Sequence, residues 1–526
     1  MVWPRKSHHE RPMSVIRSLR ALRLALCAIS LTAAPAAAQL IPIKTIPIAT
    51  GDQFNFFPSA NQAMGGVSVA LADSLLDPFI NPAKGGRLRS GAMQFFGAPT
   101  FYSISHASGG GQTIPVGALG SRGDLFGGAV VAMQELNPSH VSTALPTPTP
   151  VLSSSALNGT PPLPPPDQLT NKYNRYAFAT LGRRVVNGLS FAGSVMYADL
   201  HRIDGVDQLY SGSQSVTQYG GDLDARFGVV RDWQNGSTLE ALILHDRLAM
   251  THDVTFAETF YDPNFRALNT RARVERNLDH TNTWGMHLGW QRPVGDSGWR
   301  VGAILTGNLL THPKLPDYQV VNVVRPVPWD PGHSAAYNLG VGVAQETGPT
   351  TFAFELIYEP ILTHTWGEAQ SELQSVDGSL IPTGGRTTEN HFTFSNVAAR
   401  LGFRQDIPIE GVQHPLRIQF GLNGHAIHYW LEQDDHVADA SRRQYEQWVE
   451  WAPTWGVSMR FGGVDLRYVG STTRGTGRPG ITSNNQFVPD VAAIGSSNVL
   501  AVPAGPLTLT PVSVTTHQLS LSVPLP

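Results

Sequence analysis

The sequence predicts an all-β fold, namely a transmembrane antiparallel β-barrel of about 14 to 16 strands with an N-terminal plug in the lumen. First, apolar residues alternate with polar or small ones over stretches of about ten residues, as in strands that separate lipid from a lumen. Second, tight turns and long loops alternate between these stretches. Third, an export signal precedes them, and no later apolar run reaches the roughly 20 residues of a membrane-spanning helix.

Residues 1–38 have the pattern of a cleavable signal peptide. Basic residues come first, an apolar run from Leu24 to Ala34 follows, and Ala36-Ala37-Ala38 provides the small residues that signal peptidase reads. Met1 and Met13 are both possible starts. The single cysteine, Cys27, lies inside this segment, so cleavage would leave no disulfide, thiolate nucleophile or cysteine–zinc site.

Residues 39–90 contain a segment whose residue types suit an irregular backbone better than a strand. Glycine lets the chain fold back tightly, and Pro82 lacks an N–H and pushes Asn81 toward the extended region. Ahead of a barrel we interpret this segment as a plug, and a surface loop rich in turn residues is the alternative. The residues of this motif are Met64, Gly65, Gly66, Asp73, Asp77, Pro78, Asn81, Pro82 and Ala83.

This motif resembles the N-terminal hatch of the outer-membrane transporters for long-chain fatty acids and aromatic hydrocarbons. Those proteins carry a Met-Gly-Gly, a small-residue run, an Asp-Pro and an Asn-Pro-Ala, and the match covers about twenty residues. Two departures are Lys84-Gly85-Gly86, where Gly-Leu is usual, and Leu75-Leu76, where acidic or polar residues are common. The resemblance implies a hatch that closes the lumen of a transport barrel.

Residues 91–526 are predicted to form the barrel. In Leu416–Asn423 and Phe352–Glu359 apolar and polar or small residues alternate, and candidate strands at 91–106 and 112–120 precede about fourteen more from Asp124 onward. Asn-Gly pairs such as Asn187-Gly188 favour the tight hairpin turns expected at the periplasmic end. The expected long outer loops are 137–171, 202–218, 253–280, 313–333, 365–388, 432–446 and 472–512.

Two features of the predicted wall bear on function. Gly127 and Gly128 are candidates for a kinked, incompletely paired wall, although a simple bend of the barrel is the preferred interpretation. Arginine on the lipid face costs about 2–4 kcal/mol at the midplane, so charges within strands are expected to face the lumen. We expect a stabilising network in preference to a substrate site for Glu355, Glu359, Arg400, Arg404, Arg417, Arg460, Asp465 and Arg467.

Little in the chain points to catalysis. His280, His287, His425 and His428 have no spacing typical of metal ligands, and we expect scattered lumenal or loop histidines and no metal. No nucleophile elbow, P-loop or dinucleotide fingerprint occurs, so we expect neither an enzyme nor a cofactor. A net charge of −3 leaves no basic surface for nucleic acid.

The favoured function, implied by the resemblance, is passive outer-membrane transport of fatty acids or aromatic hydrocarbons through a plugged barrel with lateral release. The alternative is an outer-membrane scaffold for secretion or surface attachment, and an enzyme at the barrel rim ranks last. The expected location is the outer membrane of a Gram-negative-type bacterium, and the expected form is a monomer. Its expected partners are outer-membrane lipid, hydrophobic small molecules and the barrel-assembly machinery, although Leu525-Pro526 departs from the aromatic ending that such barrels usually have.

Overall fold

The structure is a computed structural model of the chain. It describes residues 44, 49–51, 53–137, 172–206, 213–262, 267–312, 332–369, 371–411, 413–479 and 509–525. The predicted signal peptide at 1–38 and most of the predicted loops 137–171, 313–333 and 472–512 lie outside this part of the chain.

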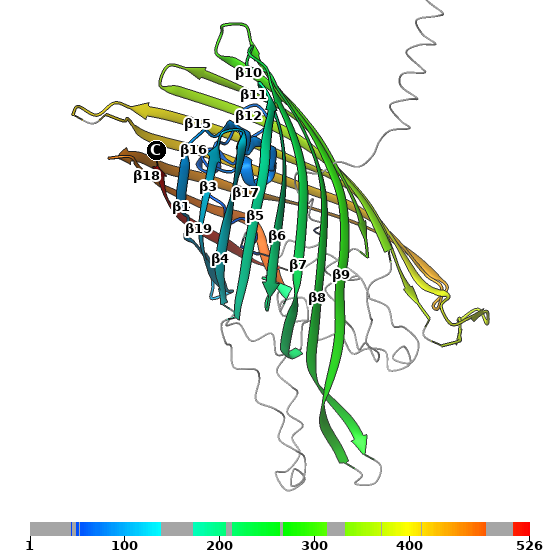
Figure 1. The fold of residues 1–526 in the computed structure, drawn as a ribbon. Helices are drawn as coiled ribbons and strands as arrows, with labels where there is room; N and C mark the ends of the chain where they lie inside the picture. Colours follow the sequence, from blue (N-terminus) through cyan, green and yellow to red (C-terminus); the bar gives the residue numbers. More distant parts are fainter. Residues whose placement is uncertain are drawn as a thin grey trace, which may run out of the picture. The chain divides into compact units, whose positions relative to one another are not determined.

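The strands form one closed antiparallel barrel, as predicted (Figure 1). The sheet has 17 strand elements, and two of them, β1 (Met93–Gly97) and β2 (Thr100–Ile104), continue a single register against both β3 (Gly110–Arg122) and β19 (Leu509–Leu525). Counting β1 and β2 as one interrupted strand gives 16 barrel strands. The two strands predicted at 91–106 and 112–120 are therefore confirmed.

Each remaining strand pairs with its neighbours in the chain, so the barrel is an up-and-down meander that closes where β19 meets β1 and β2. A small separate hairpin, β13 (Leu373–Gln374) with β14 (Leu380–Ile381), lies between β12 and β15 in the chain. The other barrel strands are β4 (Leu125–Asn137), β5 (Lys172–Val186), β6 (Leu189–Leu200), β7 (Ser213–Asp232), β8 (Thr238–Asp262), β9 (Ala267–Val294), β10 (Trp299–Thr311), β11 (Gly332–Thr347), β12 (Thr350–Glu368), β15 (Arg386–Ile407), β16 (Leu416–Asp435), β17 (Ala440–Phe461) and β18 (Val464–Pro479).

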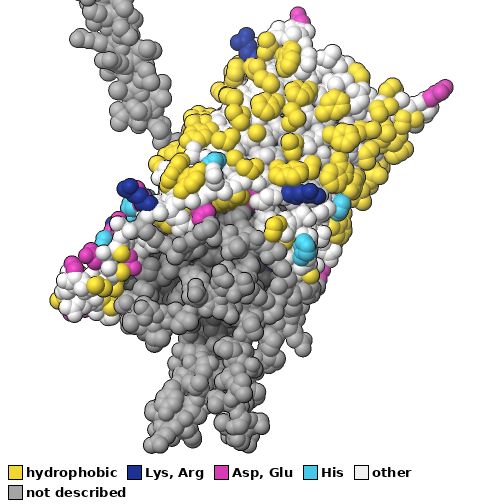
Figure 2. All heavy atoms as spheres, turned by 180° about the vertical axis from the view of Figure 1, so that it is seen from behind, with side chains coloured by type: hydrophobic (Ala, Val, Ile, Leu, Met, Phe, Trp, Pro, Cys, Tyr) yellow, Lys and Arg dark blue, Asp and Glu magenta, His cyan; other side chains and the backbone are white. Residues whose placement is uncertain are grey.

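The two faces of the wall differ in side-chain type, as period-two strands between lipid and lumen require. On β12, the outward Phe354 and Leu356 are 41% and 42% exposed, whereas the inward Glu355 is 2% exposed. Figure 2 shows hydrophobic side chains over much of one outer face, with histidines and several charged side chains along its lower border. The wall therefore has the apolar outer band of a transmembrane barrel. Among the described residues, no helix is long and apolar enough to cross a bilayer.

Two of the expected long loops are instead strand. β8 and β9 continue to Asp262 and Ala267, and β16 and β17 meet at a short turn over 436–439. Figure 1 shows β8 and β9 running past the neighbouring strands. The prediction of loops at 253–280 and 432–446 was wrong because, beyond the lipid, both faces of a hairpin carry polar residues and the period-two apolar signal disappears.

The segment before β1 contains three short helical turns, η1 (Gln62–Met64), α2 (Asp77–Ile80) and η2 (Pro82–Arg87). η2 contacts β4 to β7, whereas η1 contacts β15 to β18 on a distant part of the closed sheet. One segment reaches both sets of strands through their inward faces, so it lies within the lumen, as predicted (Figure 1). The division at residue 90 between plug and barrel stays a prediction.

The orientation of β12 predicts the effect of a charge on its outer face. Leu356→Arg should lower the free energy of unfolding in lipid vesicles by about 2–4 kcal/mol, because Leu356 faces lipid well inside the apolar band. Gln345→Arg, on the same face near the turn between β11 and β12, should cost only about 0–1 kcal/mol. Equal effects of the two substitutions would contradict the assigned faces.

Candidate functional site

Asp73 holds the first half of the plug in its fold. Its buried carboxylate accepts hydrogen bonds from the backbone N–H groups of Ala60, Asn61 and Leu76 at 2.9, 3.1 and 3.0 Å, and from the Ser59 hydroxyl at 2.5 Å. An irregular segment has no ladder partners for such groups, and buried N–H groups without partners are costly. One carboxylate therefore substitutes for the missing secondary structure.

Glycines in the wall form a seat for η1. Gly402 of β15 and Gly421 of β16 are cross-strand partners. A Cβ on Gly421 would lie 2.1 Å from the Gly65 nitrogen, and one on Gly402 would lie 2.6 Å from the Met64 carbonyl oxygen. Gly65 itself has φ +74°, a conformation that favours glycine. The plug backbone thus approaches the wall to a distance that only glycine permits.

A hydroxyl of β17 completes this seat. Thr454 is the cross-strand partner of Gly421. Its Oγ1 accepts a hydrogen bond from the Gly65 N–H at 2.9 Å and donates one to the Ala63 carbonyl at 2.8 Å. The seat therefore satisfies polar groups of the plug backbone as well as making room for them.

A second glycine pair lies beneath the next part of the plug. Gly302 of β10 pairs with Gly342 of β11, and a Cβ on Gly302 would lie 1.9 Å from the Val69 carbonyl oxygen. Nearby, Glu355 Oε2 accepts the N–H groups of Ser68 and Val69, both at 2.8 Å. The plug is thereby held to β12 by its backbone.

Asn81 anchors the second half of the plug. It is fully buried, its Oδ1 accepts the Ala83 N–H at 3.2 Å, and its Nδ2 donates to Glu240 Oε2 of β8 at 3.0 Å. A Cβ on Gly228 of β7 would lie 1.9 Å from Asn81 Oδ1, so a glycine again makes room for the contact. The asparagine caps η2 and ties it to the wall.

Lys84, which departs from the hatch pattern, forms an ion-paired cluster beside Asn81. Its buried ammonium lies 3.0 Å from Glu240 and 3.1 Å from Asp77. Burial raises the pKa of Asp77, against the opposing effect of Lys84. Burial would lower the pKa of Lys84, but the carboxylates of Asp77 and Glu240 outweigh it and the pKa is raised. The lysine is therefore charged at neutral pH, and the Arg87 guanidinium, 3.5 Å from Asp77, adds a second positive charge beside the two carboxyl groups.

The remaining motif residues serve the backbone of the plug. Pro78 lies in the first turn of α2, Pro82 begins η2, and Ala83 is fully buried. Gly66 has φ +75° with open space around its Cα, so its conformation and not a close contact favours glycine.

Gly127 and Gly128 do not interrupt the wall. The ladders from β4 to β3 and to β5 pass through both residues without a shift in register. A Cβ on Gly128 would lie 2.1 Å from the Ala118 carbonyl oxygen, so close strand contact explains this glycine. Incomplete pairing, the less favoured of the two interpretations of Gly127 and Gly128, is therefore not found in the strand ladders. Between β1 and β2, the Ala98 N–H donates to the Pro115 carbonyl at 3.3 Å and the Pro99 carbonyl accepts from the Leu519 N–H at 3.0 Å, so the wall is bonded there as well.

The structure brings each of the predicted lumenal charges next to an oppositely charged or ionisable group. Most of these pairs lie within the turn-side half of β12 and β15 to β18. The pairs are Glu355–Arg400 at 2.9 Å, Arg417–Asp406 at 2.8 Å, Arg460–Asp465 at 3.0 Å, Arg467–Asp465 at 3.7 Å, Arg404–Glu346 at 3.5 Å and Glu359–His425 at 2.8 Å. The Glu355–Arg400 pair also bonds the plug backbone, at Ser68, Val69 and Gly66.

An aromatic group on the inward face was missed by the sequence analysis. Phe392 and Phe394 of β15 and Tyr429 of β16 pack together with ring centroids 5.2 to 6.1 Å apart, alongside Ile361 and Leu431. We call these five residues the lumenal aromatic cluster. Inward positions of a barrel are usually polar. The sequence did contain a signal: Phe392 and Phe394 are an even number of positions from the inward Arg400, so all three residues lie on the same face of the strand.

The lumenal aromatic cluster lies on the loop side of the plug. Along β15 the plug contacts Arg400 and Gly402, whereas Phe394 is six residues further than Arg400 from the connection between β15 and β16. On the other side of the barrel the plug phenylalanines Phe57 and Phe79 pack against Phe178 of β5. These side chains are buried in packed groups: Phe392, Phe394 and Tyr429 are 1 to 5% exposed, and Phe57, Phe79 and Phe178 are 2 to 8% exposed.

Comparisons with known proteins give weak likenesses. No protein-family model matches the chain, and no curated protein sequence matches it. A FadL homologue of Pseudomonas aeruginosa is 12% identical with a TM-score of 0.41, covering 89% of this chain and 98% of its own. The Ralstonia pickettii toluene transporter TbuX is 10% identical with a TM-score of 0.39, covering 90% and 99%. At these values the likeness assigns neither a family nor a function to the chain.

The glycine seat predicts that a side chain at Gly421 displaces the plug. Gly421→Val should raise ion conductance in planar bilayers, because its Cβ would overlap the Gly65 nitrogen. Gly424→Val is the matched control on the same strand, where a Cβ meets nothing closer than 3.8 Å. Unchanged conductance in a folded Gly421→Val barrel would show that the plug does not close the lumen.

The Asn81 anchor predicts a local loosening of the plug. Asn81→Ala leaves Glu240 Oε2 and the Ala83 N–H each without one partner, at a cost of about 1–3 kcal/mol per group. Hydrogen exchange of residues 77–88 should become faster, whereas heat-modifiable migration of the barrel on gels should not change. Loss of that migration would instead make Asn81 a residue required for barrel folding.

Proposed function

We propose that the protein carries hydrophobic small molecules, such as fatty acids or aromatic hydrocarbons, passively across the outer membrane of a Gram-negative-type bacterium. The observation that carries this proposal is the lumenal aromatic cluster above the plug. An apolar solute gains about 25 cal/mol per Å² on leaving water. The rings of Phe392, Phe394 and Tyr429 are 1 to 5% exposed, so a solute would bind there by displacing the groups that cover them.

We further propose that the cargo leaves the barrel sideways into lipid, because the plug fills the lumen below it. The segment is held to the wall on two sides, by the seat around Gly421 and by the anchor at Asn81. A cargo bound above it meets packed backbone on the straight path through the lumen. Sideways exit into lipid would spare an apolar cargo the charged, turn-side half of the lumen, and the resemblance of the hatch motif favours this route.

A scaffold for secretion or surface attachment is the second candidate function. It is favoured by the length of β8 and β9, which have 25 and 28 residues, against about 10 for a strand that only crosses the membrane. A hairpin that projects so far offers edges and faces to another protein. No lumenal binding is required for such a role, so the two functions are separable by experiment.

The transport proposal predicts a loss of uptake when the lumenal aromatic cluster is cut back. Phe394→Ala should weaken cargo binding by about tenfold or more, because burying a phenylalanine contact contributes about 1.5–3 kcal/mol. The effect would be measured as uptake of labelled fatty acid and of toluene by cells that lack the native gene and express either the native protein or the Phe394→Ala variant. Phe420→Ala, a lipid-facing phenylalanine that is 55% exposed, is the matched control.

Two outcomes would contradict the proposal at different levels. If cells take up both compounds equally with and without the protein, the transport proposal fails and the scaffold takes its place. If the native protein supports uptake but Phe394→Ala does so equally well, the aromatic cluster packs the upper barrel and binds no cargo.

A further inference from the structure

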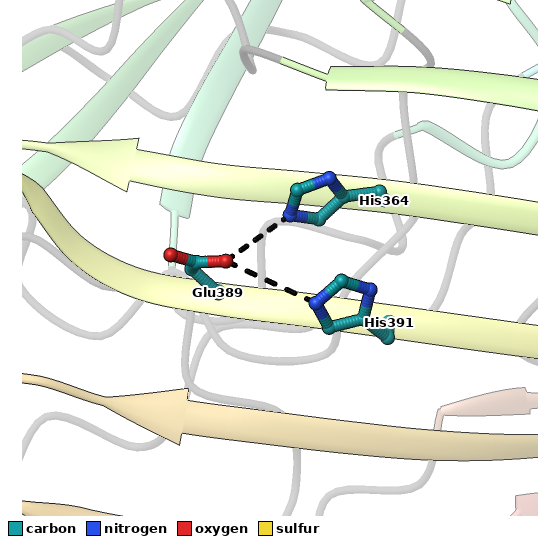
Figure 3. Close-up of side chains that lie close together, drawn as sticks. All are labelled: His364, Glu389 and His391. Carbon is teal, nitrogen blue, oxygen red and sulfur yellow. Dashed lines mark hydrogen bonds and ion pairs between the residues drawn. The ribbon is translucent and has the colours of Figure 1, made fainter.

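Two histidines and a glutamate meet on the outer wall, on the loop side of the apolar band (Figure 3). His364 of β12 and His391 of β15 are cross-strand partners. Glu389 lies two residues from His391 on the same strand, so all three side chains share one face. Strand pairing therefore brings the three side chains together, although His364 is 25 residues from Glu389 in the sequence.

The donor atoms are close enough for one ion. His364 Nε2 lies 3.3 Å and His391 Nε2 lies 3.9 Å from the same Glu389 oxygen, and the three donor atoms all fall within 4.8 Å of one another. Donors bound to zinc at about 2.0–2.2 Å in a tetrahedron are roughly 3.3–3.6 Å apart. His436, in the turn between β16 and β17, places its Nε2 3.4 Å from the other Glu389 oxygen.

We propose that His364, His391 and Glu389 bind a divalent transition-metal ion of the zinc class. Two imidazoles and one carboxylate are a donor set typical of zinc and its neighbours, whereas calcium and magnesium prefer oxygen alone. His436 or water takes the fourth position. The ion would join β12 and β15 and, through His436, the turn between β16 and β17.

The location gives ions access from water. Leu362, two residues before His364 on the outward face, is the last apolar residue of that face before the cluster, and it is 55% exposed. The His391 side chain is 49% exposed. The histidines thus lie beyond the lipid-facing band and within reach of aqueous metal.

Arg386 competes with the ion for the carboxylate. Its Nη1 lies 2.9 Å from Glu389 Oε2, and its guanidinium lies over the Trp366 ring at 4.7 Å. Metal binding has to displace this arginine from Glu389. A variant without Arg386 should consequently bind the ion more tightly, an effect that histidines binding metal independently of Glu389 would not show.

The experiment uses the full chain, purified without a histidine tag, stripped with a chelator and titrated with Co²⁺ and Zn²⁺. The native protein should take up one equivalent, seen in the visible spectrum of bound Co²⁺ and by calorimetry with Zn²⁺. His364→Ala, His391→Ala and Glu389→Gln should each weaken binding at least about tenfold. Arg386→Ala should strengthen it several-fold, and heat-modifiable migration should confirm that each variant is folded.

His517→Ala is the matched control, because this exposed wall histidine of β19 bonds Tyr468 at 2.8 Å outside the cluster. It should leave metal binding unchanged. The proposal is overturned if the native protein binds no stoichiometric Zn²⁺, or if His517→Ala weakens binding as much as His364→Ala does. It is equally overturned if Glu389→Gln and Arg386→Ala both leave the affinity unchanged.

Discussion

A closed backbone ladder is the constraint on which the rest of this structure depends. Within lipid every N–H and C=O group needs a partner in the protein, and a sheet meets this demand only when its first and last strands join. Here β19 pairs with β1 and β2, so the ladder has no free edge at the seam. In a closed barrel each side chain faces either lipid or the lumen, according to whether its position along the strand is odd or even, which we call its parity. The apolar band, the inward charges and the plug seat all follow from this alternation.

Parity also explains how much of the fold was predictable from the sequence. Alternation in stretches such as Leu416–Asn423 is a local pattern, so the strands and their faces were identified without knowing their partners. The pattern disappears where both faces meet water, so the sequence of the outer parts of β8 and β9 predicts a loop although the structure has strands there. The plug was found through its turn residues, which are equally local.

The seat and the clusters were not predictable because they exist only across strands. Gly402 and Gly421 look like ordinary strand glycines until their pairing places them under Met64 and Gly65. His364 and Glu389 are 25 residues apart in the chain and become neighbours through the register of β12 and β15. Lys84 similarly stood out as a departure from a motif, and only the fold shows that Asp77 and Glu240 surround it. Removing one partner of a buried ion pair is far more costly than replacing the whole pair with apolar residues.

The position of the seam has a consequence for how the molecule is built. The plug precedes β1 in the chain, and β19 follows every other described strand. Without β19 the sheet would be open along one side, and the lumen that holds the plug would not be enclosed. A chain that ended before β19 would present two unpaired edges to the membrane and leave the glycine seats without an enclosed plug. Closure of the wall and enclosure of the plug therefore depend on the same strand.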